Sequence, residues 1–548
     1  MRRGRGLTRE ARLDLLTGAI VVLVCAGGQL WLLLGPHPFD PAYYFQLGAE
    51  FPSGVRDYWA LRIGLLAPVR AAHVLFGPSE AALYAVPVAT TVLLAGAVYG
   101  TMVALFRDRL LGAAAALVTA LNPSWLFNSS FLFPDTTATA TFTAGILCLV
   151  LGRGRPEDED RGWVPTAAAV GAGVFFGWTY LVREFSPILL PAVAAAVLIL
   201  RYPLRRVAVL VVATLATFSL ELLHGLVRFG DPLVRFDVLR DRRDTIGPGR
   251  QRWMEQLHEQ LGNPLDTVLV FPRLLLAWNT GWIFLLLLGV FVVGLVLLRD
   301  RRLALLAAWL FTFWAAMAVF GLWRVSSGEL IVNVTNIRYW YPIFPPLVMG
   351  AFGSLGLLAR EFVSGRRGIV LAVAVPVLVA ALALVPGTIE FRSCTAKNIW
   401  RNEPFGHWDE LRSWLARPES ERFAALRTDH HSLRLVPAYT RSTFGRSLWD
   451  GAVESRAARG RVIVPVTDRD DVLLLVHKRF QKAGLGRLRR EWSPVFQSED
   501  GWIVALAHDS ATTDAVGVAD QPWWERPPGR GRAAHVGECG LSQFEPRG

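Results

Sequence analysis

The sequence predicts an α-helical polytopic membrane protein that carries a small α/β domain near its C-terminal end. Two features of composition support this prediction: 53% of the 548 residues are hydrophobic and only 19% are charged, against about 25% in soluble domains. The pattern supports it too, because several apolar runs approach the roughly 20 residues that a helix needs to cross a bilayer. The net charge of +12 comes from arginines scattered among short loops. This distribution is typical of cytoplasmic loops of membrane proteins and not of a nucleic-acid-binding surface.

Hydropathy predicts about 11 transmembrane helices. In chain order, the expected ranges are 14–34, 81–105, 110–128, 131–151, 164–182, 186–200, 207–227, 278–298, 303–322, 341–359 and 368–386. Residues 58–77 are left out because a span there would bury Arg62, Arg70 and His73. An interfacial amphipathic helix in the first outer loop is expected instead.

Loop charge predicts the orientation of these helices. The connections at 107–109, 152–163, 201–206, 299–302 and 360–367 are short and carry arginine. The positive-inside rule places them in the cytoplasm and gives an N-in, C-out topology. The long, irregular segments then all lie on the outer side of the cell membrane, so we expect the chemistry of this protein to be extracytoplasmic.

Composition divides the chain into four parts. They are a cytoplasmic N-terminus at 1–12, a membrane domain at 13–386, an extracytoplasmic α/β domain at 387–509 and a disordered tail at 510–548. The tail is expected to be disordered because it is rich in Gly, Pro and Arg and shows little periodicity. Within the α/β domain, the pattern predicts a helix at 408–415, strands at 461–466 and 472–476, and a hairpin at 492–506.

The four cysteines are too few for a disulfide framework or a zinc cluster. Cys25 and Cys148 fall inside apolar runs and are interpreted as packing residues, whereas Cys394 and Cys539 could pair if both lie outside the cell. Residues 429–431 read Asp-His-His. No further acid or cysteine is near them in the sequence, so we interpret them as a surface turn and expect no metal or other cofactor.

Two acids are candidates for chemistry. Asp40 is the first acid after the first apolar run and lies on a turn stiffened by Pro38 and Pro41. Taken alone, it is equally an ordinary exposed turn acid. Asp135 follows Pro134 at the outer end of a span, where an acid suits a helix N-terminus whether or not it has a further function.

Charged groups at two other outer turns are candidates for binding. Arg183 and Glu184 stand between two apolar runs, on the side where arginine opposes the positive-inside trend. Taken alone, they are a self-satisfied ion pair. Arg338 and Tyr339 lie at the outer mouth of a span among other aromatics, where an aromatic belt with a snorkelling arginine is the ordinary interpretation.

Considered together, these groups indicate one site. Two acids and two arginines from four distant parts of the sequence fall on one face, at the depth of a lipid headgroup. Arginine would bind the phosphate of a lipid-linked sugar donor, whose tail would lie between helices. A carboxylate would accept the proton of the attacking hydroxyl, and arginine would stabilise the leaving phosphate.

The order of several motifs over residues 13–390 resembles a known family. The motifs are the acid-bearing first outer loop, Phe76-Gly77-Pro78-Ser79, the acid opening the fourth span, Gly-x-x-x-Leu-x-Arg-Glu at 177–184 and Arg-Tyr-x-x-Pro at 338–342. They resemble GT-C glycosyltransferases of the protein O-mannosyltransferase and lipid A aminoarabinose transferase type. The resemblance implies a polyprenyl-phosphate sugar donor and inversion at the sugar carbon, often without a catalytic metal.

The resemblance also implies residue roles. Asp40 would be the general base and Asp135 the second acid, which orients the acceptor or the sugar. The residues expected to bind substrate or organise the site are Arg62, Arg183, Glu184, Arg338 and Tyr339. Many relatives have a second acid directly after the first, but here Pro41 follows Asp40, which argues against a paired-carboxylate or metal-binding role.

Two other function classes remain open at the level of sequence. A lipid or solute transporter or flippase would show inverted repeats and ionisable groups inside its spans; here Glu221 and His224, near an outer end, are the main such groups. A non-catalytic membrane scaffold with an outer binding domain is the second alternative. The sequence specifies neither the sugar, with mannose and arabinose both compatible, nor the acceptor, which could be a protein, a glycan or a lipid.

Overall fold

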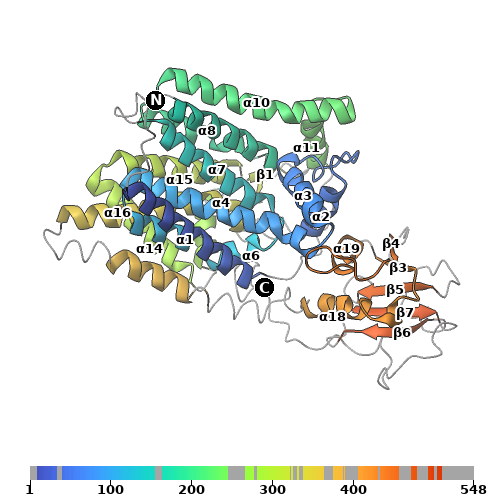
Figure 1. The fold of residues 1–548 in the computed structure, drawn as a ribbon. Coiled ribbons are helices and arrows are strands. Elements are labelled where there is room, and N and C mark those ends of the chain that lie inside the picture. Colours follow the sequence, from blue (N-terminus) through green and yellow to red (C-terminus); the bar gives the residue numbers. More distant parts are fainter. Residues whose placement is uncertain are drawn as a thin grey trace, which may run out of the picture.

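The computed structural model describes most of the chain. The described residues are 9–33, 40–154, 163–184, 186–244, 266–276, 280–320, 322–324, 330–332, 337–362, 374–386, 388, 405–429, 432–455, 471–477, 492–498 and 503–508. The expected strand at 461–466, the tail at 510–548, and Cys394 and Cys539 lie outside these residues. The described part consists of a bundle of long helices and a smaller domain with a sheet, which lies at one end of the bundle (Figure 1).

Long apolar helices make this a polytopic membrane protein. Seven helices of the described residues are long and apolar enough to cross a bilayer. They are α1 (Arg9–Trp31), α4 (Glu80–Phe106), α7 (Pro134–Gly152), α8 (Trp163–Val182), α10 (Leu204–Phe229), α15 (Arg301–Phe320), and η3 (Ile337–Ile343) continuing into α16 (Phe344–Phe362). Several of the other expected spans correspond to shorter apolar helices, namely η2 (Ser186–Leu189) with α9 (Leu190–Ile199), α14 (Trp282–Leu298), and 374–386.

The span expected at 110–128 is bent. It consists of α5 (Arg109–Ala120) and α6 (Pro123–Ser129), which meet at an angle of 57°. The break has a local cause, because the Asn122 side chain accepts a hydrogen bond from Trp125 N at 2.8 Å and Pro123 occupies the first turn of α6. Both features start a new helix and end the preceding one. Counting this pair as one span brings the described total to eight.

The segment expected to be the first outer loop folds onto the end of the bundle near the C-terminal domain as α2 (Asp40–Ala49) and α3 (Ile63–Phe76). At 14 residues, α3 is short for a span, and it packs against α2, α4 and α8. Gly64 permits this packing, because a Cβ there would lie 2.8 Å from the backbone of Leu181. This close approach brings Arg62, at the start of α3, beside the turn that follows α8.

The C-terminal domain has a five-stranded mixed sheet. Its elements are α18 (Phe405–Leu415), β3 (Ala425–Thr428), η5 (Ser432–Arg434), α19 (Val436–Tyr439), β4 (Ala452–Ser455), β5 (Val472–His477), β6 (Trp492–Gln497) and β7 (Ile503–His508). The strand order is β4-β3-β5-β7-β6, with β3 parallel to β4 and β5, and β7 antiparallel to β5 and β6. The expected helix at 408–415, the strand at 472–476 and the pairing of the final hairpin are confirmed.

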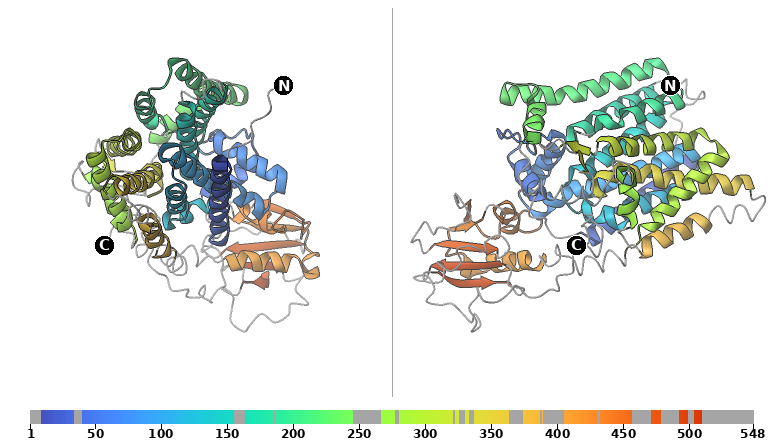
Figure 2. Two further views of the ribbon diagram at one scale, coloured as in Figure 1. Left: turned by 60° about the vertical axis from the view of Figure 1, so that its left-hand side comes forward. Right: turned by 180° about the vertical axis from the view of Figure 1, so that it is seen from behind.

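The C-terminal domain packs against the first outer loop. Arg412 of α18 forms an ion pair of 2.8 Å with Glu80 at the start of α4, and Ala81 N donates a hydrogen bond to Thr443 O at 2.9 Å. One buried apolar cluster contains Tyr44 of α2 and Tyr439 of α19 together. Figure 2 shows the sheet beside α2 and α3 from two further directions. The domain therefore lies next to the residues predicted to form the site.

Three further short elements complete the described fold. Helix α11 (Val234–Asp244) follows α10 at the same end of the bundle as α2 and α3 (Figure 1). Helix α13 (Asp266–Leu276) packs against α14 and α15. Strands β1 (Leu322–Arg324) and β2 (Leu330–Val332) form an antiparallel pair after α15.

Candidate active site

A buried carboxylate joins two arginines at the end of the bundle that faces the C-terminal domain. Asp135 lies in the first turn of α7 and its side chain is 1% exposed. Its two oxygens lie 3.0 Å from Arg183 Nε and 3.8 Å from Arg338 Nε. Arg183 follows the last turn of α8 and Arg338 lies in η3, so three elements distant in sequence meet at this carboxylate.

Aromatic rings hold the two guanidinium groups in place. Arg338 lies 4.5 Å from the ring centre of Phe133 and 5.2 Å from that of Tyr339, while Arg183 lies 5.5 Å from the Tyr339 ring. Arg338 Nη2 also donates a hydrogen bond of 3.4 Å to the Tyr339 hydroxyl. Cations at such distances are attracted to the ring faces. The predicted residues Asp135, Arg183, Arg338 and Tyr339 therefore form one contact group.

Glu184 is the centre of a second group of ion pairs. Its carboxylate lies 3.1 Å from Arg62, 3.5 Å from Arg183 and 3.3 Å from Arg235, and it accepts a hydrogen bond from Tyr58 Oη. Burial alone would raise the pKa of Glu184, but the three arginine charges outweigh burial and hold that pKa well below its ordinary value. Glu184 is therefore ionised at neutral pH, and Arg183 belongs to both groups.

Arg62 is buried in the protein and not exposed to lipid. Its side chain is 3% exposed, and its guanidinium donates to the hydroxyls of Tyr44 and Tyr58. The same guanidinium lies 4.1 Å from the ring centre of Tyr58. The sequence analysis predicted that Arg62 does not lie inside a membrane span. In the structure Arg62 precedes α3, a helix that is short for a span, which agrees with this prediction. Its partners were not predicted.

A further buried pair extends the network toward α10. Arg235 of α11 forms an ion pair with Glu221 of α10, and Tyr180 Oη donates to Glu221 at 3.1 Å. Both charged side chains are at most 5% exposed. Sequence analysis singled out Glu221 only as a charge near a span end, and it missed Arg235. The turn Gly230-Asp231-Pro232, which brings α11 back against α8, was the available signal for Arg235.

Asp40 differs from the other acids of the site because it is half-buried. Within the described residues, no hydrogen bond or ion pair engages its carboxylate. Its charge nevertheless acts on Tyr44, Arg338 and Arg434. Asp40 therefore stands at the edge of the arginine groups as an accessible acid.

The C-terminal domain contributes one cation to this edge. Arg434 of η5 is half-buried and lies 4.2 Å from the ring centre of Tyr43 in α2, whose hydroxyl donates to Asp57. Burial lowers the pKa of Arg434, while the charges of Tyr43, Asp40 and Asp57 act in the opposite direction. Sequence reasoning missed Arg434, because nothing in its local sequence indicates that η5 docks on the first outer loop.

The described residues contain no group of three or more His, Cys, Asp or Glu side chains that could hold a metal ion. The geometry provides a half-buried carboxylate, Asp40, whose charge acts on the guanidinium group of Arg338. Fixed guanidinium groups bind phosphate, and an accessible carboxylate can accept a proton. The arrangement therefore has the chemical parts of a site that transfers a group from a phosphate ester.

The fold resembles that of ArnT, a lipid A aminoarabinose transferase of the GT-C superfamily. The chain matches ArnT of Cupriavidus metallidurans, crystallised with undecaprenyl phosphate, with a TM-score of 0.55 and 14% identity over 92% of this chain and 99% of that chain. It also matches an oligosaccharyltransferase of Archaeoglobus fulgidus, crystallised with zinc and sulfate, with a TM-score of 0.45 and 15% identity over 78% of this chain and 62% of that chain. No protein-family model and no curated protein sequence match the chain.

Proposed function

We propose that this protein is a glycosyltransferase that moves a sugar from a polyprenyl-phosphate donor to the hydroxyl of an extracytoplasmic acceptor, with inversion at the sugar carbon. The observation that carries the proposal is that an accessible acid and a buried acid with two arginines lie at the same end of the bundle. Asp40 is accessible, whereas Asp135 is buried between Arg183 and Arg338. The fold similarity to ArnT, which was crystallised with undecaprenyl phosphate, supports the choice of donor.

Arg183 and Arg338 bind the donor phosphate in this proposal. Their guanidinium groups are held by Asp135 and by the ring of Tyr339. A group fixed in this way needs little reorganisation when charge develops on the phosphate. In this proposal Asp135 is a positioning residue that acts through the two arginines. This role differs from the one implied by the family resemblance, in which Asp135 orients the acceptor or the sugar.

Asp40 acts as the general base. The acceptor oxygen attacks the anomeric carbon of the sugar while its proton passes to the Asp40 carboxylate. The bond between that carbon and the phosphate oxygen breaks, and the polyprenyl phosphate leaves with the bonding electron pair. Attack on the face opposite to the leaving phosphate inverts the configuration at this carbon.

Glu184 and Arg434 support the reacting groups without touching the sugar. Glu184 forms ion pairs with Arg62, Arg183 and Arg235. It therefore helps to fix the position of Arg183, which binds the donor phosphate in this proposal. Arg434 places a positive charge near Asp40 from the C-terminal domain.

We place this site on the outer side of the cell membrane, following the arginine-rich loops at the other end of the bundle. The donor sugar is a hexose or a pentose, with mannose and arabinose as the first candidates. The acceptor is a glycan, lipid or protein of the cell envelope. The partners are therefore the lipid-linked donor, this acceptor and the bilayer.

A donor panel tests the proposal. Wild type and Asp40→Asn would be purified in detergent and supplied with radiolabelled polyprenyl-phosphate sugars together with a cell-envelope extract as acceptor. Wild type is expected to consume one donor, and Asp40→Asn is expected to lose about 100-fold or more in rate. Tight binding of polyprenyl phosphate without transfer would favour a transporter, and the absence of both binding and transfer would contradict the proposal.

A further inference from the structure

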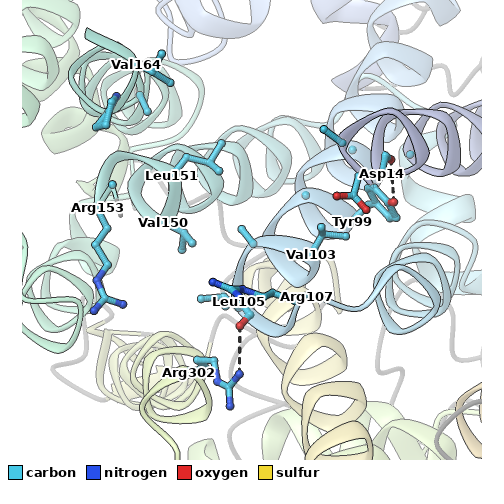
Figure 3. Close-up of a pocket in the computed structure, with 18 of the residues that line it drawn as sticks. Asp14, Tyr99, Val103, Leu105, Arg107, Val150, Leu151, Arg153, Val164 and Arg302 are labelled. Carbon is cyan, nitrogen blue, oxygen red and sulfur yellow. Dashed lines mark hydrogen bonds between the residues drawn. The ribbon is translucent and has the colours of Figure 1, made fainter. Parts of the chain in front are cut away.

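A large cavity lies at the end of the bundle opposite to the candidate active site. It has a volume of about 1520 Å³ and is lined by residues of α1, α4, α7, α8, α9 and α15. This exceeds the roughly 300–1,000 Å³ of ordinary small-molecule pockets. Helix α7 runs from Asp135 to the cavity, so the two sites are separated by its length of about 28 Å. Figure 3 shows the lining side chains around the open space.

Arginines gather at this cavity. Arg107 ends α4, Arg153 ends α7, and Arg301 and Arg302 begin α15. Among the described residues no carboxylate pairs with Arg107, Arg153 or Arg301, whereas Arg302 is paired with Asp300. The one lining acid, Asp14, is itself paired with Arg109. The described lining therefore carries excess positive charge.

Helix capping does not account for Arg153. The carbonyl groups at the end of α7 accept hydrogen bonds from Arg206, which lies 3.1 Å from Gly152 O and 2.6 Å from Arg153 O. The Arg153 side chain is exposed and points away from α7 in Figure 3. It is therefore free to contact an anion at the cavity.

The rest of the lining is apolar. Val22, Val103, Val150 and Ile199 face the cavity from four different helices. Leu15, Leu151 and Val164 also line it and are 61%, 51% and 44% exposed, so the cavity opens sideways, where lipid would surround a membrane helix. Cationic side chains above apolar walls match a molecule with an anionic head and a hydrocarbon tail.

We propose that this cavity binds one anionic phospholipid of the cytoplasmic leaflet, with its phosphate on Arg107, Arg153 and Arg301 and an acyl chain along the valine-lined wall. The excess positive charge of the lining favours an anionic lipid over a neutral one. Anionic lipids are concentrated in the cytoplasmic leaflet, and basic pockets between helices on that side bind their headgroups. This site needs no transfer chemistry. It therefore rests on the proposed orientation of the chain in the membrane but not on the transfer reaction.

Lipid retention tests this site. Wild type would be purified in detergent, mixed with equal amounts of phosphatidylglycerol and phosphatidylcholine, and examined by native mass spectrometry. Wild type is expected to keep one phosphatidylglycerol per chain in preference to phosphatidylcholine. The double variant R107Q/R153Q is expected to retain it about thirty-fold less well, because each arginine near a membrane surface favours an anionic lipid by about fivefold.

A matched control separates this site from a general positive surface. Arg299 ends α14 with the same left-handed backbone as Arg107, with φ of 49° against 55°, and Arg201 has φ of 52°. All three are exposed, but Arg201 and Arg299 do not line the cavity. R201Q/R299Q should therefore retain phosphatidylglycerol as wild type does. Equal loss in both double variants, or equal retention of the two lipids by wild type, would overturn the proposal.

Two further variants keep the test decisive. Val164→Glu places a carboxylate at an exposed lining position, where it should fold normally and repel the lipid phosphate. Residues 157–160 are four acids that lie outside the described residues, in the connection between α7 and α8. If phosphatidylglycerol binds only after all four are changed to amides, the arginines of the cavity form ion pairs with these acids in the wild-type protein, and the lipid proposal is wrong.

Discussion

Arginines stand at both ends of this helix bundle, but their surroundings differ. At the end near the C-terminal domain, which we propose is the outer end, Arg62, Arg183 and Arg235 are at most 11% exposed and share the carboxylate of Glu184. At the opposite end, Arg107 and Arg153 are exposed and have no ion-pair partner among the described residues. A buried cation that is fixed by acids and rings costs much to assemble and holds one geometry. An exposed cation costs little and adapts to a mobile lipid headgroup.

The comparison supports the proposal of catalysis at one end and of lipid binding at the other. Stabilising a developing negative charge requires donors that are already in place. The buried network at the outer end meets this requirement, whereas the exposed arginines at the other end do not. The following predictions test this difference, from the largest expected effect to the smallest.

The largest effect is expected for Asp40→Asn. The amide keeps the shape of the side chain but cannot accept the acceptor proton, so the transfer rate should fall by about 100-fold to 10,000-fold. Because Asp40 makes no ion pair among the described residues, the melting temperature should stay within about 2 °C of wild type. Transfer assays and thermal melts of the same preparations check both parts. Unchanged transfer would remove Asp40 from the mechanism.

The next effect is on stability. Arg183→Met leaves the Asp135 carboxylate, 1% exposed, beside only the more distant Arg338. Breaking a buried ion pair in this way should destabilise the protein by about 3–5 kcal/mol. Arg107→Met at the opposite end should change stability by no more than about 0.5 kcal/mol. Denaturation in detergent compares the two variants, and equal effects would contradict the difference between the two ends.

The ion pairs of Glu184 should make the stability of the protein depend on pH. Its pKa is held well below the ordinary value by three arginines. Such a group contributes stability that is fully present above the unfolded pKa of about 4.3 and is lost as the pH falls through the lower folded pKa. The melting temperature of wild type should therefore exceed that of Glu184→Gln at neutral pH, and this gap should begin to narrow as the pH falls below about 4. A gap of the same size at pH 7 and at pH 3 would show that Glu184 does not act through its charge.

The smallest effect is expected for Arg434→Gln. Arg434 acts on Asp40 across the contact between the C-terminal domain and α2. Loss of its charge should lower the transfer rate by about tenfold or less. Arg434→Lys should restore the rate. Equal rates in all three proteins would assign Arg434 to packing alone.

Sequence reasoning could predict that Asp135, Arg183 and Arg338 lie together, because the expected topology places them, with Asp40, on one face. A carboxylate or guanidinium at a span end must lie near the headgroups, so a correct span order fixes its depth. The bend at Asn122 and Pro123 was also readable, since both residues are helix-start signals. It was missed because the apolar run continues across them.

Tertiary packing explains what was not predicted. Tyr44 and Tyr58 reach Arg62 only because α2 and α3 fold back onto α8. Arg434 reaches the site only because η5 docks on the first outer loop. Likewise, the parallel strands β3 and β4 are too short to give a clear period in the sequence. None of these contacts is encoded by the spacing of neighbouring residues.

One measurement tests the difference between the two ends most directly. Wild type, R183Q/R338Q and R107Q/R153Q would each be titrated with fluorescent polyprenyl phosphate and, separately, with fluorescent phosphatidylglycerol. R183Q/R338Q should lose polyprenyl phosphate and keep phosphatidylglycerol, while R107Q/R153Q should show the reverse. Equal binding of polyprenyl phosphate by wild type and R183Q/R338Q would contradict the claim that the buried arginines at the outer end form the donor phosphate site.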